Sequence, residues 1–293
     1  MKPALMLIIF LAAFIVARAQ SSANQPTPDI RTYKTVGATK VPAHIFRPQD
    51  DARGKPLPVI VLFHGGGWVA GSPDWVYETA QRYASYGAVA IAAEYRLCDQ
   101  TAITPLDSLA DARDLIAWLQ ANSKELGINP SLLAVYGVSA GGQLAAALAT
   151  IPDPVRPNAA LGPVAMVMIS PAVSVVHAGW FQRILMGKAT AASLSPDEHI
   201  NGRIPPTVIF HGAADTLVPI SGVRGFCQRA QKFASDCEIV EYPGVGHLFT
   251  RKLDSQESDF DPDPSGVADA RARGDGFLAA HGILPLFKFL PAK

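Results

Sequence analysis

The sequence predicts an α/β protein with a mostly parallel, doubly wound sheet, helices on both faces and a small lid. Short, continuous apolar runs alternate with longer stretches of helical spacing almost to the end of the chain. Continuous apolar runs are typical of parallel strands, because helices cover both faces of such a sheet. Apolar residues make up 49% of the 293 residues, which is enough for a sizeable core.

The expected strands are short and run in order along the chain. The first two are divided by Gly37 and Pro42, and most of the others are continuous apolar runs. The last one alternates more and is therefore expected nearer an edge of the sheet. The expected strands are Ile30–Val36, His44–Phe46, Pro58–Phe63, Ala88–Tyr95, Leu132–Tyr136, Ala165–Ser170, Thr207–Phe210 and Glu238–Tyr242.

Helices are expected between these strands. Pro73 and Pro105 can each start one, because the fixed φ of proline suits the first helical turn. In the last helix, Gly274 and Gly276 each weaken the helix by about 1 kcal/mol. The expected helices are Pro73–Tyr86, the stretch from Pro105 to Leu119, Ala140–Thr150, Val223–Phe233 and Val267–Ala280.

Residues 1–19 predict a secretory signal peptide that is not part of the fold. Lys2 supplies positive charge, Ala4–Val16 is an unbroken apolar run, and Ala17-Arg18-Ala19 is a small-x-small cleavage site. The alternative is a membrane anchor, but the apolar run is shorter than the roughly 20 residues that a spanning helix needs. We therefore expect a secreted or periplasmic protein with no stable membrane anchor.

Charge and cysteine content exclude several classes of partner. The 25 basic and 25 acidic residues balance, and no basic tract suggests nucleic acid. No Cys/His cluster has metal-ligand spacing, so no metal is expected. Cys227 and Cys237 can pair across a helix-to-strand junction and leave Cys98 free, or all three can be buried thiols. The sequence leaves both possibilities open.

The most informative motif is GVSAGG, Gly137–Gly142, which joins the apolar run ending at Tyr136 to a helix-forming run. Glycines two residues before and after Ser139 make room for a sharp strand-to-helix turn, so the motif predicts a nucleophile elbow. Such a serine needs a base and an oxyanion site before it can act. The alternative is a serine that serves only the turn.

A glycine-rich loop, HGGGW at His64–Trp68, directly follows another expected strand. Its glycines leave backbone N–H groups bare and let the chain approach a ligand closely. A tetrahedral intermediate has a negative oxygen that requires such donors. Gly66 and Gly67 are the candidate donors from this loop, and the N–H of Ala140 is the third.

Two further motifs offer an acid and a base. HGAADTLVP, His211–Pro219, puts Asp215 just past the end of one strand, and GVGHLF, Gly244–Phe249, puts His247 in a loop after the next. Ligands of a doubly wound sheet bind at the carboxyl ends of its strands. Ser139, Asp215 and His247 are therefore expected to meet at that edge.

Together the four motifs resemble those of the α/β-hydrolase superfamily, in its esterase/lipase branch similar to hormone-sensitive lipase and the small bacterial acetyl and feruloyl esterases. The resemblance covers residues 58–282 and implies a single catalytic domain in residues 20–293, a serine ester hydrolase that uses no cofactor. It also implies a catalytic triad and three oxyanion donors, namely the nucleophile Ser139, the general base His247, its orienter Asp215, and the N–H groups of Gly66, Gly67 and Ala140.

The segment 171–206 is expected to supply the lid. It holds an apolar cluster that either lines an acyl pocket or packs on the core as a helix, namely Trp180, Phe181, Ile184, Leu185 and Met186. With little chain before Ile30 to form an N-terminal cap, we expect short acyl esters of the acetyl or feruloyl type. They would be small molecules or groups linked to a polysaccharide, and the oligomeric state stays open.

Three other functions are compatible with parts of the sequence. An amidase similar to the arylformamidases shares HGGGW and the triad, and a binding-only module shares the fold without catalysis. Gly65, Gly67 and Ala70, followed by Glu94, outline a dinucleotide-binding loop. That loop is not in the first βα unit, and a dinucleotide fold leaves the serine elbow unexplained.

Several polar residues have structural interpretations. His64 and His211 fall where strands pass into loops, and Trp68 is expected to pack beside the site. Asp111 is expected to be a solvated or loop-bracing charge, and Asp215 has the alternative of capping the helix that starts near Pro219. The acidic, proline-containing stretch at 254–264 is expected to be a surface loop.

Overall fold

In the computed structural model, residues 27–49, 54–99, 101–156 and 162–286 are described, and they form one eight-stranded sheet with helices on both faces. The strand order is β1-β2-β4-β3-β5-β6-β7-β8. The strands are β1 (Asp29–Val36), β2 (Thr39–Phe46), β3 (Leu57–Phe63), β4 (Val89–Ala93), β5 (Ile128–Val138), β6 (Ala165–Ile169), β7 (Thr207–Gly212) and β8 (Cys237–Tyr242). The predicted signal peptide lies outside the described residues.

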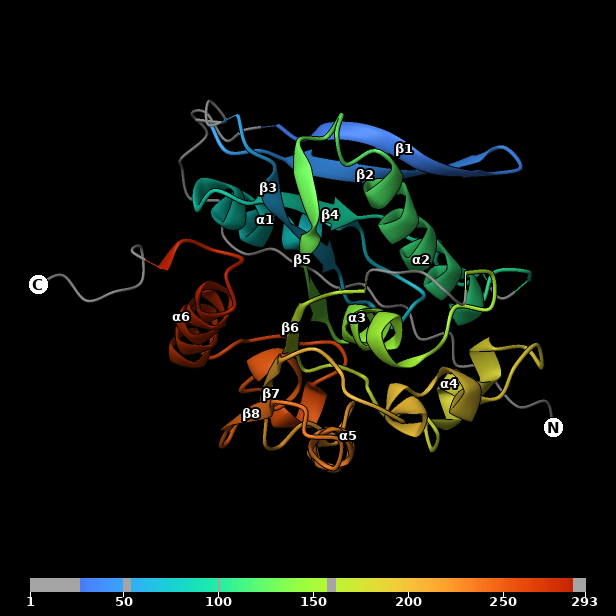
Figure 1. Ribbon diagram of the computed structural model, residues 1–293. Helices are drawn as coiled ribbons and strands as arrows, with labels where there is room; N and C mark the ends of the chain where they lie inside the picture. Colours follow the sequence, from blue (N-terminus) through green and yellow to red (C-terminus); the bar gives the residue numbers. More distant parts are fainter. Residues whose placement is uncertain (1–26, 50–53, 100, 157–161, 287–293) are drawn as a thin grey trace, which may run out of the picture.

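Helices α1 and α6 lie on one face of the sheet, and α2, α3 and α5 lie on the other (Figure 1). The α-helices are α1 (Tyr77–Ser85), α2 (Pro105–Ala121), α3 (Ala140–Thr150), α4 (Gly179–Ile184), α5 (Ile220–Gln231) and α6 (Pro264–Ala280). Short 3-10 helices are η1 (Pro73–Val76), η2 (Ala191–Leu194), η3 (Pro196–His199), η4 (His247–Phe249) and η5 (Leu253–Ser255).

The sheet is mostly parallel and buried on both faces, as the continuous apolar runs predicted. From β4 to β8 every neighbouring pair of strands is parallel, and only the pairs β1–β2 and β2–β4 are antiparallel. Along β3, Val61 and Phe63 join the core under α2 and α3, whereas Ile60 and Leu62 join the core under α1 and α6. The more alternating strand β8 lies at an edge, which confirms its expected place.

The expectation that Pro42 ends a strand is wrong. Strand β2 continues through Pro42, which lies opposite Thr32 where the register of β1 shifts before Lys34. Proline has no N–H to donate to a neighbouring strand, and an irregularity in the ladder accommodates this loss. The strand is therefore longer than its local sequence suggests.

Helix α6 begins at Pro264, three residues before the expected start, because the side chain of Asp263 caps it by accepting from Gly266 N–H at 2.7 Å. Gly274 is buried where α6 crosses the sheet. A Cβ on Gly274 would lie 3.3 Å from a methyl carbon of Val167 and 3.5 Å from the ring of Phe210. This glycine weakens the helix but allows it to approach the sheet closely.

Of the two possibilities for the three cysteines, the structure has the one with a disulfide. Cys227 of α5 and Cys237 of β8 are bonded, and Cys98 is a buried free thiol. The bridge joins the helix to the edge strand that precedes the loop of His247. No helix within the described ranges is long and apolar enough to span a membrane.

Replacing Cys227 and Cys237 by serine is expected to lower the free energy of unfolding by about 2–3 kcal/mol, because the bridge restricts the unfolded chain. Urea unfolding of the oxidised protein and of the double variant measures the difference. Reductant should bring the natural protein to the variant's midpoint and leave the variant unchanged. Equal midpoints before reduction would contradict the prediction.

Candidate active site

Ser139 lies on the turn between β5 and α3 with φ 52° and ψ −113°, which an L-residue rarely adopts. A backbone of this kind costs about 1–3 kcal/mol and persists only where its surroundings fix it. Ser139 N–H donates to the carbonyl of Ile169 at 2.9 Å, and Ser139 C=O accepts from Gly142 N–H at 3.0 Å. These bonds hold the hydroxyl at the carboxyl edge of the sheet.

The glycines of the elbow are needed because backbone segments come very close. A Cβ on Gly137 would lie 2.4 Å from the carbonyl oxygen of Gly141, and one on Gly141 would lie 2.2 Å from that of Phe63. A Cβ on Gly65 would lie 3.4 Å from the Cβ of Ser139. The elbow therefore packs directly against the start of the glycine-rich loop.

The structure brings Ser139, His247 and Asp215 together. The Nε2 atom of His247 lies 3.0 Å from the Oγ atom of Ser139, and its Nδ1 atom lies 2.7 Å from Asp215 Oδ2. Nδ1–H donates to the carboxylate, which leaves Nε2 as the acceptor for the serine hydroxyl. A hydroxyl, a base and an acid in this order form an arrangement that can activate a nucleophile.

The carboxylate of Asp215 is buried and is held by backbone donors. Its Oδ1 atom accepts from the N–H groups of Leu217 at 3.0 Å and Val218 at 2.8 Å. The interpretation of Asp215 as a helix cap is wrong, because α5 begins only at Ile220 and has no side-chain cap. Its other oxygen, Oδ2, is left to face His247.

His211 is also in contact with Asp215, which the sequence did not indicate. Its Nε2 atom lies 2.8 Å from the carbonyl oxygen of Val218 and 3.3 Å from Asp215 Oδ2. Burial lowers the pKa of His211, so the ring is neutral at pH 7 and its Nε2–H donates. His211 therefore helps to orient the carboxylate without adding a positive charge.

His64 holds the base of the glycine-rich loop. Burial lowers its pKa to about 4, so it is neutral, and its Nδ1–H donates to the carbonyl of Gly65 at 2.7 Å. Its ring stacks on Tyr95 with 4.4 Å between centroids, and the Tyr95 hydroxyl donates to His64 C=O at 2.9 Å. These contacts are structural, as the position of His64 at a strand end suggested.

The three expected oxyanion donors lie on the two segments that meet at Ser139. Gly66 and Gly67 have φ values of 106° and 60°, and a Cβ on Gly66 would lie 2.1 Å from the carbonyl oxygen of Ala70. Ala140 is the first residue of α3, so its N–H has no intrahelical acceptor. The N–H of Ala140 therefore needs an acceptor outside α3.

The apolar cluster of the lid divides into two parts. Phe181 and Leu185 are fully buried, which is the core-packing alternative, but Trp180 is 37% exposed. Trp68 is buried and packs against both parts, with its ring centroid 4.7 Å from that of Phe181 and 6.0 Å from that of Trp180. A Cβ on Gly67 would lie only 3.1 Å from the Trp180 indole. Trp180 therefore borders the glycine-rich loop.

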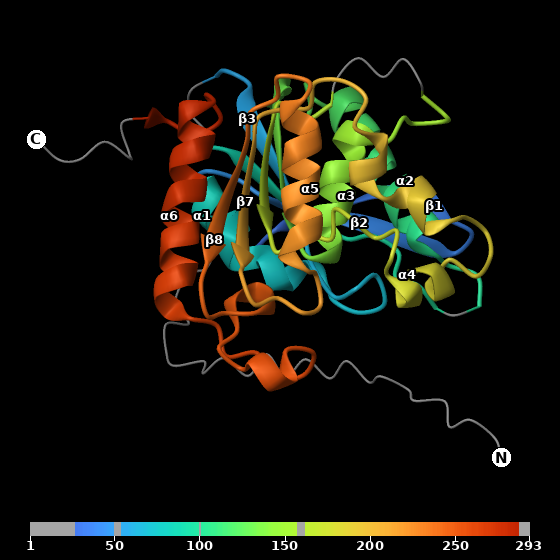
Figure 2. The same ribbon diagram turned by 90° about the horizontal axis from the view of Figure 1, so that it is seen from below.

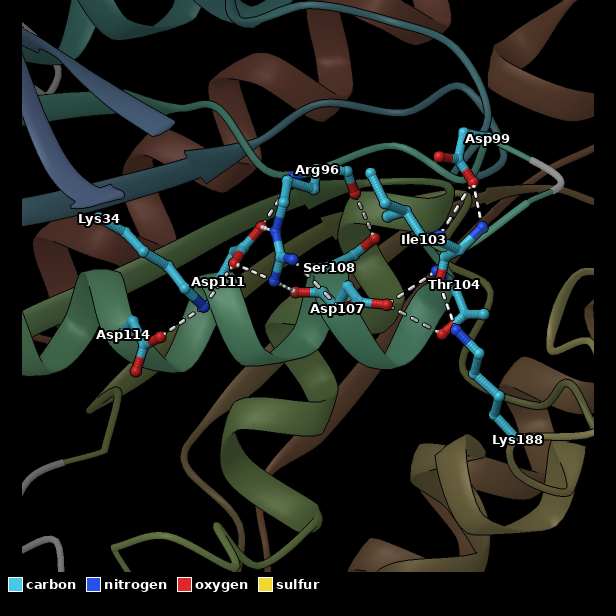
Figure 3. A network of polar contacts seen from close by, with 11 residues as sticks. Lys34, Arg96, Asp99, Ile103, Thr104, Asp107, Ser108, Asp111, Asp114 and Lys188 are labelled. Carbon is cyan, nitrogen blue, oxygen red and sulfur yellow. Dashed lines mark hydrogen bonds and ion pairs between the residues drawn. The ribbon is translucent and has the colours of Figure 1, made fainter. Parts of the chain in front are cut away.

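A buried ion pair braces the segment that follows β4 (Figure 3). Both side-chain oxygens of Asp111 accept from the Arg96 guanidinium at 2.8 Å, and Lys34 Nζ lies 2.6 Å from the same carboxylate. Asp111 is 0% exposed, so the expectation of a solvated charge is wrong and the loop-bracing alternative holds. A two-pronged contact of this kind fixes direction as well as distance.

The braced segment reaches both the glycine-rich loop and the lid. Cys98 N–H donates to the carbonyl of Trp68 at 2.7 Å, and Lys188 Nζ donates to the carbonyl of Ala102 (Figure 3). Asp99 Oδ1 accepts three backbone N–H groups of the same turn, which hold the pKa of Asp99 below its usual value. The segment that follows β4 thus supports both the glycine-rich loop and the expected lid segment, residues 171–206.

The loop that carries His247 is strained. Leu248 (φ 52°) and Phe249 (φ 64°) are consecutive non-glycine residues in the left-handed region. Leu248 N–H donates to Ser170 Oγ at 3.2 Å, and His247 N–H donates to Gln256 Oε1 at 2.9 Å. Neither partner is indicated by the sequence pattern, because Ser170 is 78 residues from Leu248 and Gln256 lies in a stretch expected to be a surface loop.

The stretch at 254–264 is not simply a surface loop. Gln256 is only 3% exposed, and Thr250 forms an isolated antiparallel bridge with Pro262. In Figure 2 the orange-red segment between β8 and α6 lies at the lower edge of the molecule, away from the sheet. Within the described part of the chain, no group of three or more His, Cys, Asp or Glu side chains is placed to hold a metal ion.

Comparison with known proteins finds α/β-hydrolases and esterases that are similar to this chain. A family model described as alpha/beta hydrolase fold matches residues 60–251. Esterase LipC of Mycobacterium tuberculosis is 25% identical over 222 residues, which are 68% of this chain and 55% of LipC. Carboxylesterase NlhH of the same species is 31% identical over 148 residues, 46% of this chain and 44% of NlhH. The chain thus spans about half the length of these curated relatives.

Solved structures extend the similarity over nearly the whole chain. Native esterase 2 of Thermogutta terrifontis superposes with a TM-score of 0.78 at 30% identity, covering 89% of this chain and 94% of that chain. Its apo form covers 91% of this chain and 99% of that chain, with a TM-score of 0.77 at 29% identity. By its sheet, its motifs and these matches, the chain belongs to the α/β-hydrolase fold family, in the esterase/lipase branch.

Proposed function

We propose that this protein is a serine carboxylic-ester hydrolase that works through Ser139, His247 and Asp215. The observation that carries the proposal is the pair of hydrogen bonds through His247, 3.0 Å to the hydroxyl and 2.7 Å to the carboxylate. The esterases among its relatives support an ester bond as the target. Hydrolysis then proceeds through an acyl-enzyme intermediate.

Each residue has a defined task in this reaction. His247 Nε2 takes the hydroxyl proton as Ser139 Oγ attacks the carbonyl carbon, and the imidazolium then protonates the leaving alcohol. His247 next activates water, which attacks the acyl-enzyme and releases the carboxylic acid. Asp215 stabilises the imidazolium and keeps Nδ1 protonated. The N–H groups that stabilise the oxyanion are those of Gly66, Gly67 and Ala140.

The substrate class in this proposal is a short acyl ester, of the acetyl or feruloyl type, free or linked to a polysaccharide. Trp180 supports the acetyl type, because its indole borders Gly67 and limits the room beside the proposed oxyanion donors. Structures of Thermogutta terrifontis esterase 2 with propionate and with butyrate bound also support short acyl groups. No cofactor takes part in the proposed reaction.

Export is a further part of the proposal. Its support is the composition of residues 1–19, with Lys2 before an apolar run and a small-x-small site at Ala17–Ala19. The secreted or periplasmic domain would then start at Gln20. Sequencing the N-terminus of the protein recovered outside the cytoplasm tests this, and a retained Met1 would count against it.

Ser139→Ala is expected to lower kcat by on the order of 10⁶, because removal of such a nucleophile abolishes the acyl-enzyme route. Hydrolysis of p-nitrophenyl acetate measures the loss, and circular dichroism checks the fold. A fluorophosphonate probe should label the natural protein and the exposed-site control Ser131→Ala, but not Ser139→Ala. Full activity of pure, folded Ser139→Ala would refute the proposed function.

Trp180→Ala is expected to raise kcat/KM for octanoyl esters relative to acetyl esters by about tenfold, because it removes a wall next to Gly67. A series of p-nitrophenyl esters of rising chain length measures the ratio. Phe233→Ala is the matched control, since Phe233 is 39% exposed and follows the far end of α5. An unchanged preference in Trp180→Ala would remove Trp180 from the account of specificity.

A further inference from the structure

Gln256 bonds to both loops that carry the acid and the base. Its Oε1 atom accepts from His247 N–H at 2.9 Å and from Thr216 N–H at 3.2 Å. Its Nε2 atom donates to the carbonyls of Ala214 at 2.9 Å and Leu253 at 3.2 Å. Because Ala214 and Thr216 flank Asp215, the Gln256 side chain bonds to the backbone on both sides of Asp215. It also bonds to the backbone N–H of His247.

The carboxamide of Gln256 provides both the donors and the acceptors that the surrounding backbone groups require. Its oxygen offers two lone pairs and its nitrogen two protons, and the bonds to the three loop segments use all of them. Glutamate would lack the donors, and an apolar side chain would leave buried backbone groups unpaired. The side chain is only 3% exposed, so water does not replace these partners.

Gly246 provides the space that Gln256 occupies. A Cβ on Gly246 would lie 2.3 Å from both the Cδ and the Oε1 atoms of Gln256. The φ of Gly246 is −99°, which any residue adopts, so a glycine is needed there for room and not for conformation. The absence of a side chain at Gly246 therefore makes room for the carboxamide of Gln256.

The loop of His247 needs such a tie. Leu248 and Phe249 both hold positive φ values, a conformation that persists only when surrounding contacts fix it. On the far side, Ser170 Oγ accepts from Leu248 N–H, and on the near side Gln256 accepts from His247 N–H. Without the carboxamide, the backbone N–H of His247 loses its bonded connection to Ala214 and Thr216, and the direct bond from the imidazole to Asp215 has less support.

We infer that Gln256 is a positioning residue, which keeps His247 and Asp215 in register, and that Gly246 is the space reserved for it. The inference rests on the proposed function, because the groups it aligns are the proposed base and its orienter. Gln256 bonds only to backbone atoms in these contacts, so it acts through His247 and Asp215.

Gln256→Met tests the hydrogen bonds at nearly constant length. It is expected to lower kcat for p-nitrophenyl acetate about 100-fold with KM within twofold, since a shift of about 1 Å in a catalytic group has such an effect. The control is Gln231→Met, which removes one bond from Gln231 Nε2 to the carbonyl of Cys237 and is expected to keep full activity. Assays run well below each variant's melting temperature, and unchanged kcat in Gln256→Met would overturn the inference.

A double-mutant cycle tests the assigned space. Gly246→Ala alone is expected to lower kcat about as much as Gln256→Ala, because the new methyl group displaces the carboxamide. In Gln256→Ala the methyl group has room, so adding Gly246→Ala should change kcat less than threefold. Gly276→Ala, where nothing lies within 4 Å of the added carbon, is the neutral glycine control. Losses that simply multiply would overturn the assignment.

Gln256→Glu gives a second readout if Gln256→Met does not fold. An ionised carboxylate would face the carbonyls of Ala214 and Leu253, so activity relative to the natural protein is expected to fall as pH rises. A pH profile parallel to that of the natural protein would overturn the inference. Active Ser139→Ala would instead refute the proposed function, whereas inactive Ser139→Ala with fully active Gln256 variants would refute the positioning role alone.

Discussion

The site depends on a backbone contact that leaves no room for side chains. Where α3 leaves the elbow, Gly141 lies so close to the end of β3 that a Cβ would sit 2.2 Å from the carbonyl oxygen of Phe63. This contact puts Ser139 next to the glycine-rich loop and aims the start of α3 at the same space. Any larger residue at position 141 would move Ser139 away from the glycine-rich loop, which holds two of the proposed oxyanion donors.

Two buried carboxylates, those of Asp215 and Asp111, support this arrangement in different ways. The buried carboxylate of Asp215 has backbone N–H groups and the neutral ring of His211 around it, so its charge acts mainly on His247. Asp111, by contrast, is buried against two cations, Arg96 and Lys34, and its charge is neutralised locally. In the proposed reaction the first carboxylate stabilises the positive charge formed on His247, whereas the second holds the loop that follows β4 in place.

The sequence predicted the features that depend on local patterns. The strands follow from apolar runs, and Ser139, Asp215 and His247 each follow a strand whose carboxyl end lies at one edge. It could not predict contacts between distant segments, such as the bonds from Gln256 to Thr216 and Ala214, which are 40 and 42 residues away. The strand through Pro42 was also missed, because its partner strand, not its own composition, accommodates the proline.

The backbone at Ser139 has an evolutionary consequence. With φ 52° and ψ −113°, this position favours glycine over every side-chain-bearing residue. Selection for a more stable fold alone would therefore discard the hydroxyl. A serine here is a trade-off in which stability is given up so that the half-buried Oγ atom of Ser139 lies at the carboxyl ends of the strands, beside His247 Nε2.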